Sequence, residues 1–347
     1  MSKALYRKYR SKKLSEVVGQ KHITTVLENA LRQGKIAHAY LFTGPRGVGK
    51  SSIARILAHE INNLPYSEED NHPDIIEIDA ASNNGVDDIR QLRDNVQVAP
   101  FSAKYRVYII DEVHMLSKAA FNALLKTLEE PPEHAVFILA TTDAHKLPAT
   151  IISRTQRFVF RFISKEDVCA HLEFIAKNEK INISKEAIEI ITERGEGSFR
   201  DSISLLDQIS SIAKKNEEIT ANLLEEALGL APKTQISALI SAFENQNSNE
   251  ILQIVRDVRN SGVDLKNFAS QLLSFITENV GKKPYLSQFL MPLTRAEKSN
   301  FIEMELLSIF IQPSFTPQLS INQNILPQIQ QKTILKPKVE NQKTSNK

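Results

Sequence analysis

Apolar runs of strand length alternate with stretches of helical spacing over the first half of the chain. The strand-like runs lie at residues 38–43, 74–79, 105–110, 135–141 and 157–162. Each run is shorter than a typical helix, whereas the segments between them place apolar residues three and four positions apart. Strands that alternate with helices form a parallel sheet with helices on both faces. The pattern therefore predicts an α/β domain over residues 1–162.

The strand signal stops after Phe162. Residues 163–230 are predicted to form several short helices, and residues 231–312 a second helical region whose apolar stripes face its own core. From Pro313 on, Gln, Asn, Pro and Lys dominate, so residues 313–347 are predicted to be a disordered polar tail. The expected organisation is a sheet domain, two helical domains and this tail.

A glycine-rich segment connects the first predicted strand to the helix that follows it. Residues 44–51 read GPRGVGKS and match the phosphate-loop pattern G-x-x-x-x-G-K-[ST]. Glycines let backbone N–H groups turn around phosphate oxygens, and the helix N-terminus adds a favourable dipole. Lys50 is expected to neutralise the β and γ phosphates, and the Ser51 hydroxyl to bind Mg²⁺. The predicted nucleotide-binding residues of this segment are Gly44, Pro45, Arg46, Gly47, Val48, Gly49, Lys50, Ser51 and Ser52.

Two acidic residues, Asp111 and Glu112, follow the apolar run at 105–110. In phosphate-loop ATPases the first acid at such a strand end holds Mg²⁺, and the second orients the attacking water. The alternative, a solvated acidic strand end, loses weight because the phosphate loop precedes it. The two motifs together predict a nucleotide-hydrolysing site.

Three further polar residues are candidates for this site. Thr142 follows the strand-like run at 135–141, where it either reaches the γ-phosphate or caps a turn. Arg154 and Arg200 lie at later junctions, one expected to contact phosphate in its own chain and one in a neighbour. Both arginines have the alternative of ordinary surface ion pairs, and sequence spacing alone leaves this open.

Composition bounds the possible classes of protein. The 347 residues suffice for two or three domains, and 41% hydrophobic with 24% charged residues is typical of a soluble protein. A net charge of +2 predicts no strong overall attraction to nucleic acid, so such contacts need a local patch. The N-terminal 20 residues hold six basic side chains, which either face solvent or nucleic acid or lie near the nucleotide.

The single cysteine, Cys169, excludes an internal disulfide and any multi-cysteine zinc site, and it fits a reducing cytoplasm. No apolar run approaches the roughly 20 residues needed to span a bilayer. The charged N-terminus lacks the apolar segment of a signal peptide. We therefore expect a cytoplasmic protein that does not contact membranes.

Six segments in one order resemble a known family. They are YRKYR…EVVGQ, AYLFTGPRGVGKSS, HPDIIEIDAASNNGVDDIRQLRD, YIIDEVHMLSKAAFNALLKTLEEPPEH, FILATTDAHKLPATIISR and GSFRDSISLLDQ. Together they resemble the gamma/tau subunit of bacterial DNA polymerase III, the AAA+ ATPase that drives the sliding-clamp loader. The resemblance is tight over residues 4–230 and loose over the helical region to about 310.

The resemblance assigns roles within the site. Lys50 and Ser51 correspond to the phosphate-loop lysine and magnesium hydroxyl, and Asp111 and Glu112 to the Walker B pair. Thr142 resembles the sensor-1 residue, Arg200 the sensor-2 arginine of the lid, and Arg154 the arginine finger that acts on ATP in the adjacent subunit. Residues expected to close over adenine and ribose are Arg7, Tyr9, Arg10, Val17 and Val18.

The resemblance also implies an architecture and partners. It predicts an AAA+ P-loop domain, a helical lid and a helical collar that mediates oligomerisation, with ATP and Mg²⁺ as cofactors. The expected partners are further copies of the chain with the delta and delta-prime subunits in a hetero-pentamer, the sliding clamp, and primer–template DNA. Lys118, Lys146 and Thr150 are expected to touch DNA phosphates, solvated surface being the alternative. The chain carries no recognisable polymerase active site and takes part in the DNA-directed DNA polymerase only as a holoenzyme subunit.

Two departures from the family pattern bear on function. Most gamma/tau chains carry four zinc-binding cysteines after the phosphate-loop helix, but residues 58–73 contain none. His59 and His72 alone do not replace a tetrahedral thiolate set, so we predict no structural zinc. The usual Ser-Arg-Cys is Ser-Arg-Thr at residues 153–155, which retains the arginine. The tail from Pro313 is too short and polar for the C-terminal domains of the long family form, so a short, gamma-like architecture is expected.

Two other functions remain as alternatives. One is a stator that does not hydrolyse ATP, like the delta-prime subunit, against which the intact Lys50, Asp111, Glu112 and Arg154 argue. The other is a helicase, because residues 111–114 read D-E-V-H and mimic a helicase box. A helicase needs a second motor domain, and residues 230–347 offer only helices and a tail. A clamp-loader ATPase subunit is the prediction.

Overall fold

The computed structural model describes residues 3–67, 72–213 and 218–311. The chain divides into two compact units, with the division between Pro232 and Lys233. The predicted sheet domain and the first predicted helical region share one unit, and the second helical region lies in the other. The predicted tail at 313–347 lies outside the described residues, and the domain boundaries within the first unit stay predictions.

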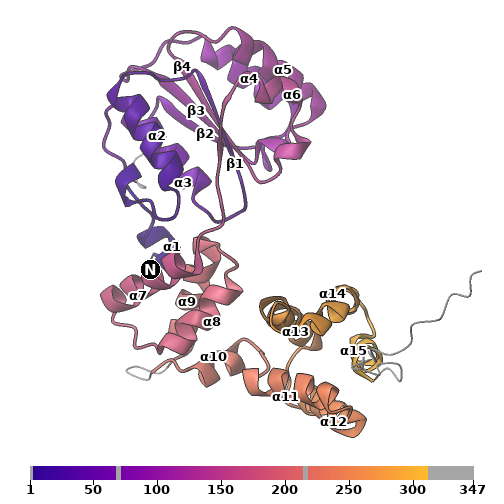
Figure 1. Cartoon of the computed structure of the whole chain (residues 1–347). Coiled ribbons are helices and arrows are strands. Elements are labelled where there is room, and N and C mark those ends of the chain that lie inside the picture. Colours follow the sequence, from indigo (N-terminus) through magenta and orange to yellow (C-terminus); the bar gives the residue numbers. More distant parts are fainter. Residues whose placement is uncertain (1–2, 68–71, 214–217, 312–347) are drawn as a thin grey trace, which may run out of the picture. The chain divides into compact units, whose positions relative to one another are not determined.

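A five-stranded parallel sheet forms the centre of the first unit, as the sequence predicts (Figure 1). The strand order is β2-β3-β4-β1-β5, so the strand before the phosphate loop lies between β4 and β5. The strands are β1 (Ala39–Thr43), β2 (Ile75–Asp79), β3 (Arg106–Asp111), β4 (Ala135–Thr141) and β5 (Gln156–Val159).

Side chains of the sheet enter two separate cores because successive residues of a strand point to opposite faces. On β1, Tyr40 and Phe42 belong to one core and Ala39 and Leu41 to the other. Every residue of β1 and β4 is buried, which fits the continuous apolar runs expected of central parallel strands. The sheet is therefore covered on both faces.

Helices from different parts of the chain cover the two faces (Figure 1). Ile23 of α2 and Ile53 of α3 pack in the core with Phe42, whereas Leu92 of α4 and Leu124 of α5 pack in the other. The helices of this part are α1 (Leu5–Lys8), α2 (Lys21–Arg32), α3 (Lys50–Ile61), α4 (Val86–Val96), α5 (Lys118–Glu129) and α6 (Ala149–Ile152). Short 3₁₀ turns are η1 (Leu14–Glu16), η2 (Val113–Met115) and η3 (Ala144–Lys146).

Four helices follow the sheet and correspond to the predicted lid. They are α7 (Lys165–Glu179), α8 (Lys185–Arg194), α9 (Phe199–Ile212) and α10 (Ala221–Ala227). Each begins with a hydroxyl side chain that accepts a hydrogen bond from the N–H three residues further on, as N-caps do. Their buried residues belong to the same core as one face of the sheet. The lid helices and the sheet thus share apolar packing.

The last strand is shorter than predicted. The sequence predicted residues 157–162, but β5 ends at Val159. Beyond it, the Gln20 side chain donates to the carbonyl of Arg161 at 2.8 Å and accepts from its N–H at 3.3 Å. The N–H of Ile163 then donates to the carbonyl of Gly197, which leads the chain into the lid. Contacts with remote segments, which local periodicity does not encode, end the strand.

The segment where the family's zinc module is expected is held by other contacts. The Asn62 side chain exchanges two hydrogen bonds with the backbone of Tyr105, at 2.9 and 2.8 Å. The buried carboxylate of Asp74 accepts from three consecutive backbone N–H groups, those of residues 101–103. No cluster of three or more His, Cys, Asp or Glu side chains that suits a metal ion occurs among the described residues. The absence of structural zinc stays a prediction.

The second unit is helical wherever the structure describes it. Its helices are α11 (Lys233–Glu244), α12 (Ser248–Asn260), α13 (Leu265–Asn279), η4 (Pro284–Phe289), α14 (Leu290–Ala296) and α15 (Ile302–Phe310). Phe243, Phe289 and Phe310 form an aromatic cluster in which the last two rings stack with centroids 4.8 Å apart. Phe268 and Leu272 of α13 are fully buried. Helical spacing in the sequence predicted this region correctly.

Candidate nucleotide site

The phosphate loop joins β1 to the first turn of α3. Gly49 is the residue before α3 and has φ 99°, while Gly47 has φ 72°. Both values lie in the left-handed region that side chains with a Cβ rarely adopt. A Cβ at Gly47 would also lie 1.8 Å from Ser198 Oγ, so the loop has no room for a side chain there. The glycines of the motif are thus required by backbone conformation and by the lid.

Lys50 and Ser51 begin α3 and point back along the loop. The buried Lys50 Nζ donates to the carbonyls of Gly44 and Pro45 at 2.8 and 2.6 Å. Burial lowers the pKa of Lys50, and the nearby carboxylates of Glu112 and Asp111 oppose that shift. Ser51 Oγ donates to Asp111 Oδ2 at 2.6 Å, which brings two hard oxygen ligands together. Oxygen ligands of this kind suit Mg²⁺.

Glu112 lies at the end of β3 in an uncommon backbone conformation, with φ 46°. Its Oε2 accepts hydrogen bonds from the Thr142 hydroxyl at 3.1 Å and from the Thr142 N–H at 3.2 Å. His114 Nδ1 lies 3.3 Å from the same oxygen. The predicted site residues at the ends of β3 and β4 are therefore in direct contact.

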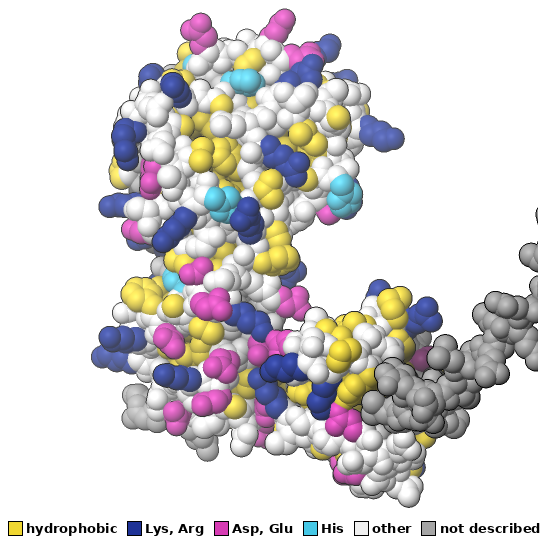
Figure 2. Space-filling model, in the orientation of Figure 1, with side chains coloured by type: hydrophobic (Ala, Val, Ile, Leu, Met, Phe, Trp, Pro, Cys, Tyr) yellow, Lys and Arg dark blue, Asp and Glu magenta, His cyan; other side chains and the backbone are white. Residues whose placement is uncertain are grey.

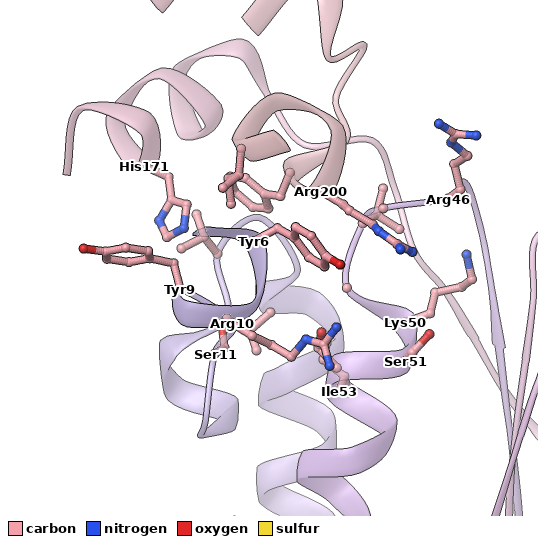
Figure 3. A pocket seen from close by; sticks show the side chains of 18 of the residues that line it. Tyr6, Tyr9, Arg10, Ser11, Arg46, Lys50, Ser51, Ile53, His171 and Arg200 are labelled. Carbon is pink, nitrogen blue, oxygen red and sulfur yellow. The ribbon is translucent and has the colours of Figure 1, made fainter. Parts of the chain in front are cut away.

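A pocket lies between the phosphate loop and the lid (Figure 3). One side, here called the sheet wall, consists of residues 46–53 with Asp111 and Glu112. The opposite side, the lid wall, consists of Tyr6, Tyr9, His171, Phe199, Arg200 and Ile203. Arg10, Ser11, Val17 and Val18 complete the lining. Both walls lie within the first unit of the chain.

The lid wall is made from two remote segments. The Arg200 guanidinium lies over the Tyr6 ring, 5.3 Å from its centroid. The Tyr9 hydroxyl is hydrogen-bonded to Glu179 at the end of α7, and burial together with this carboxylate raises the pKa of Tyr9 to about 12. The His171 ring packs against Phe199 with centroids 5.0 Å apart, and burial lowers the pKa of His171. Tyr9 and His171 are therefore expected to be neutral at physiological pH.

The structure brings most of the predicted nucleotide-binding residues to the pocket. Gly44 and Pro45 meet the Lys50 ammonium through their carbonyls and do not line the pocket. Arg7 also lies outside the lining, and its Nε donates to the Tyr6 hydroxyl at 3.3 Å. Thr142 reaches the site through Glu112. Lining residues that sequence reasoning missed are Tyr6, Ser11, Ile53, His171, Phe199 and Ile203.

The predicted finger arginine and the DNA candidates lie outside this pocket. Arg154 forms an ion pair with Glu129 at 2.6 Å and donates to the carbonyl of Thr150 at 2.9 Å. Lys146 pairs with Asp143 at 2.8 Å, whereas Lys118 is the exposed first residue of α5. Figure 2 shows lysine and arginine side chains scattered over its visible face without one dense patch.

Models of known families match three successive parts of the chain. Residues 19–164 match the model described as DNA polymerase III, delta subunit. Residues 167–214 match the ATPase lid domain of the DNA polymerase III clamp loader subunit, and residues 219–281 match domain III of DNA polymerase III subunits gamma and tau. The matched order follows the order of sheet, lid and second helical region.

Matches to individual proteins show whether the chain is closer to the delta or to the gamma and tau subunits. The chain is 38% identical over 295 residues to DNA polymerase III subunit gamma of Buchnera aphidicola, with 81% of each chain covered. The chain belongs to the gamma/tau family of DNA polymerase III subunits. It is also 44% identical to subunit tau of Bacillus subtilis and 41% identical to subunit tau of Escherichia coli, over 79% and 78% of this chain. It spans about half the length of these two tau subunits, 51% and 44%.

Solved structures show the same fold outside the gamma/tau family. The RuvB Holliday junction branch migration motor of Thermotoga maritima matches with a TM-score of 0.52 and 22% sequence identity. The match covers 68% of this chain and 79% of the RuvB chain. The likeness shows an AAA+ fold, which in general binds nucleotide together with Mg²⁺. Within the described part of this gamma/tau family member, no helix is both long and apolar enough to cross a bilayer.

Proposed function

We propose that this chain is an ATP-driven motor subunit of the bacterial replicative clamp loader. It would bind and hydrolyse ATP to open the sliding clamp and load it on primed DNA, within the DNA polymerase III holoenzyme. The observation that carries the proposal is the arrangement of Lys50, Ser51, Asp111 and Glu112 along one wall of a pocket that a lid faces. Membership of the gamma/tau family supports it.

The sheet wall fits a nucleoside triphosphate with Mg²⁺. Bound there, Mg²⁺ would supply charge stabilisation to the phosphates, and Ser51 Oγ and Asp111 Oδ2 would hold it. The Lys50 ammonium, which the loop carbonyls already orient, would neutralise the β and γ phosphates. The backbone N–H groups of residues 46–52 would meet phosphate oxygens, and Arg10, Val17 and Val18 would contact the adenosine.

Glu112 is proposed to orient and polarise the attacking water. Phosphoryl transfer depends on positioning and on charge more than on covalent help. The Thr142 hydroxyl and N–H fix Glu112 Oε2 in place, so Thr142 controls where this carboxylate points. His114 Nδ1 also lies 3.3 Å from Glu112 Oε2, and the His114 side chain is only 8% exposed. A sensor-1 role for Thr142 therefore acts through Glu112 as well as through the γ-phosphate.

The two arginines are proposed to act on different nucleotides. Arg200 lines the pocket of its own chain. Arg154 lies elsewhere, paired with Glu129, and would reach the ATP of an adjacent subunit as an arginine finger. To reach that ATP, the Arg154 guanidinium would have to leave Glu129.

Assembly and partners follow the family. Clamp-loader subunits work in assemblies, and we propose a hetero-pentamer of this chain with the delta and delta-prime subunits, in the cytoplasm, acting on the sliding clamp and on primer–template DNA. Lys118, Lys146 and Thr150 are proposed to contact DNA phosphates. Lys118 supports this because a cation at the first position of α5 faces an unfavourable helix dipole, which an anionic partner would offset.

The decisive experiment is reconstitution of the chain with delta, delta-prime, clamp and primed DNA. We expect ATP turnover that primed DNA stimulates and that Glu112→Gln abolishes while labelled ATP still binds. A stator would show no turnover with any combination of partners. A helicase would separate DNA strands without partners. Either of these results would overturn the proposal.

A further inference from the structure

Arg200 differs from Arg46 and Arg154 in how its charge is balanced. Arg46 pairs with Asp201 at 3.1 Å and Arg154 with Glu129 at 2.6 Å. Within residues 3–67, 72–213 and 218–311, Arg200 forms no ion pair with a carboxylate. Its guanidinium instead lies over an aromatic ring. No carboxylate in the described part of the chain therefore neutralises the Arg200 charge, which is available to an anion.

The ring under Arg200 belongs to Tyr6, which is half-buried in α1. A guanidinium within about 6 Å of a ring centroid is attracted by the ring quadrupole. Arg7 shares this ring, because its guanidinium lies 5.8 Å from the ring centroid and its Nε donates to the Tyr6 hydroxyl at 3.3 Å. Hydrogen bonding to Arg7 first, and then the charges of Arg7 and Arg200 with a hydrogen bond to Arg200, lower the pKa of Tyr6. In Figure 3 the Arg200 guanidinium lies beside Tyr6, on the side of the pocket where Lys50 lies.

Helix α1 is fastened to the lid, so Tyr6 and Arg200 belong to one body. The N–H of Leu5 donates to Asp207 Oδ2 of α9 at 3.1 Å. Lys8 pairs with Glu179 of α7 at 2.7 Å, and the Tyr9 hydroxyl bonds to the same carboxylate. If the lid moves, α1 is expected to move with it, and the pair stays assembled.

The start of α9, which carries Arg200, contacts the phosphate loop. The N–H of Arg200 donates to the carbonyl of Gly47 at 3.4 Å, and Ser198 lies against Gly47. Arg200 therefore enters the pocket next to the loop that is expected to hold the phosphates. Its side-chain direction is then set by what lies beneath it, which is Tyr6.

We propose that Tyr6 is a positioning residue that holds the Arg200 guanidinium toward the phosphates of a bound nucleotide. The inference rests on the proposed nucleotide-binding function and adds a residue that the phosphate-loop and lid motifs do not contain. Tyr6 acts through its ring face and the hydroxyl is secondary. Phenylalanine is therefore expected to replace it, and leucine is not.

A double-mutant cycle tests the coupling. Dissociation constants of a ribose-labelled fluorescent ATP are measured for the full chain and for Tyr6→Leu, Arg200→Ala and the double variant. We expect Tyr6→Leu to weaken binding about 2- to 5-fold, the range for an exposed cation–π pair. In the Arg200→Ala background the same change is expected to have no further effect. Tyr6→Phe is expected to bind like the wild type.

The matched control is Val18→Ala, which trims the pocket at a lining residue outside the Tyr6–Arg200 pair. Its effect should be the same in the wild-type chain and in the Arg200→Ala background. If Tyr6→Leu is also additive with Arg200→Ala, Tyr6 only lines the pocket and the inference fails. Should Tyr6→Leu not fold, pentafluorophenylalanine at position 6 keeps the ring shape and reverses its quadrupole, and must weaken binding by a similar factor.

The failure of the proposed function gives a different result. If the wild-type chain does not bind the labelled ATP at all, the nucleotide site is wrong and the cycle has no starting value. If it binds ATP and the cycle shows no coupling, the nucleotide site stands and the role of Tyr6 is rejected.

Discussion

The two walls of the pocket are built by different means. The sheet wall comes mainly from one continuous segment, residues 46–53, which a strand and a helix hold at either end. The lid wall joins residues from α1 with residues from α7 and α9, and contacts such as Leu5 with Asp207 span 202 positions. A local backbone motif thus places the groups proposed to bind phosphate, whereas tertiary packing places the opposite wall.

The walls also differ in electrostatics. On the sheet wall the Lys50 cation lies among two carboxylates, those of Asp111 and Glu112, and is hydrogen-bonded by loop carbonyls. On the lid wall the Arg200 cation lies on an aromatic ring. The sheet wall suits an ion-pair network with Mg²⁺, and the lid wall suits an adjustable single charge. Substitutions on the sheet wall should therefore have larger effects than those on the lid wall.

The largest expected effect lies outside both walls. If Arg154 acts on a neighbour's nucleotide, Arg154→Ala should lower ATP turnover of the assembled complex by on the order of 10³-fold. Mixing Arg154→Ala with Lys50→Ala subunits should recover part of the ATPase, because some interfaces combine a wild-type finger with a wild-type pocket. Steady-state turnover of the mixtures, compared with each variant alone, is the measurement. Mixtures no more active than their components would mean that the pocket is complete within one chain.

The next effect concerns the sheet wall. Lys50→Ala should lower turnover by roughly 10²–10³-fold, as expected for the loss of one group that stabilises transition-state charge. Labelled-ATP binding and hydrolysis are both measured. Lys35→Ala removes an exposed lysine outside the pocket and serves as the control. A Lys50→Ala effect no larger than that of Tyr6→Leu would erase the difference between the walls.

A smaller effect is expected within the sheet wall, at Thr142. Thr142→Val removes the hydroxyl donor to Glu112 Oε2 and leaves the N–H donor in place. Turnover should fall about 10-fold, less than in Glu112→Gln, with ATP binding unchanged, since one charge-assisted hydrogen bond is worth roughly 1.5 kcal/mol. Thr155→Val, on a hydroxyl outside the pocket, is the control. Unchanged turnover in Thr142→Val would mean that the Thr142 hydroxyl does not position Glu112.

The smallest effect is a pH dependence on the lid wall. Burial lowers the pKa of His171, so the folded chain binds a proton there less readily than the unfolded chain. Its contribution to stability is complete above the unfolded pKa of about 6.5 and declines as the pH falls below that value. Thermal unfolding of wild type and His171→Gln is compared at pH 8 and pH 5.5. The wild type should lose more stability on acidification than the variant, and an equal loss would place His171 in a solvated position.

The sequence predicts the sheet wall of the site better than the lid wall. The phosphate loop and the acids at the end of β3 depend on residues close in sequence, and the structure contains the expected elements. The end of β5 depends on Gln20, which local periodicity does not reveal. His171 lies on an ordinary amphipathic helix, and no pattern marked it.

The N-terminal segment shows a subtler limit. Its basic and aromatic residues were expected to close over the nucleotide, and Tyr9 and Arg10 line the pocket. Arg7 does not line it: its Nε donates to the Tyr6 hydroxyl at 3.3 Å, and Tyr6 lines the pocket instead. The sequence pattern does not encode which of these two neighbours faces the pocket.

The close approach of Gly47 and Ser198 links the substitutions that two distant positions can accept. Ser198 Oγ accepts from the N–H of Asp201 and so caps α9, and the same oxygen occupies the space that any side chain at position 47 would need. A substitution in the phosphate loop at position 47 would therefore first unwind the start of the lid helix. Among descendants of this chain, a side chain at position 47 should therefore appear only where Ser198 has also been replaced.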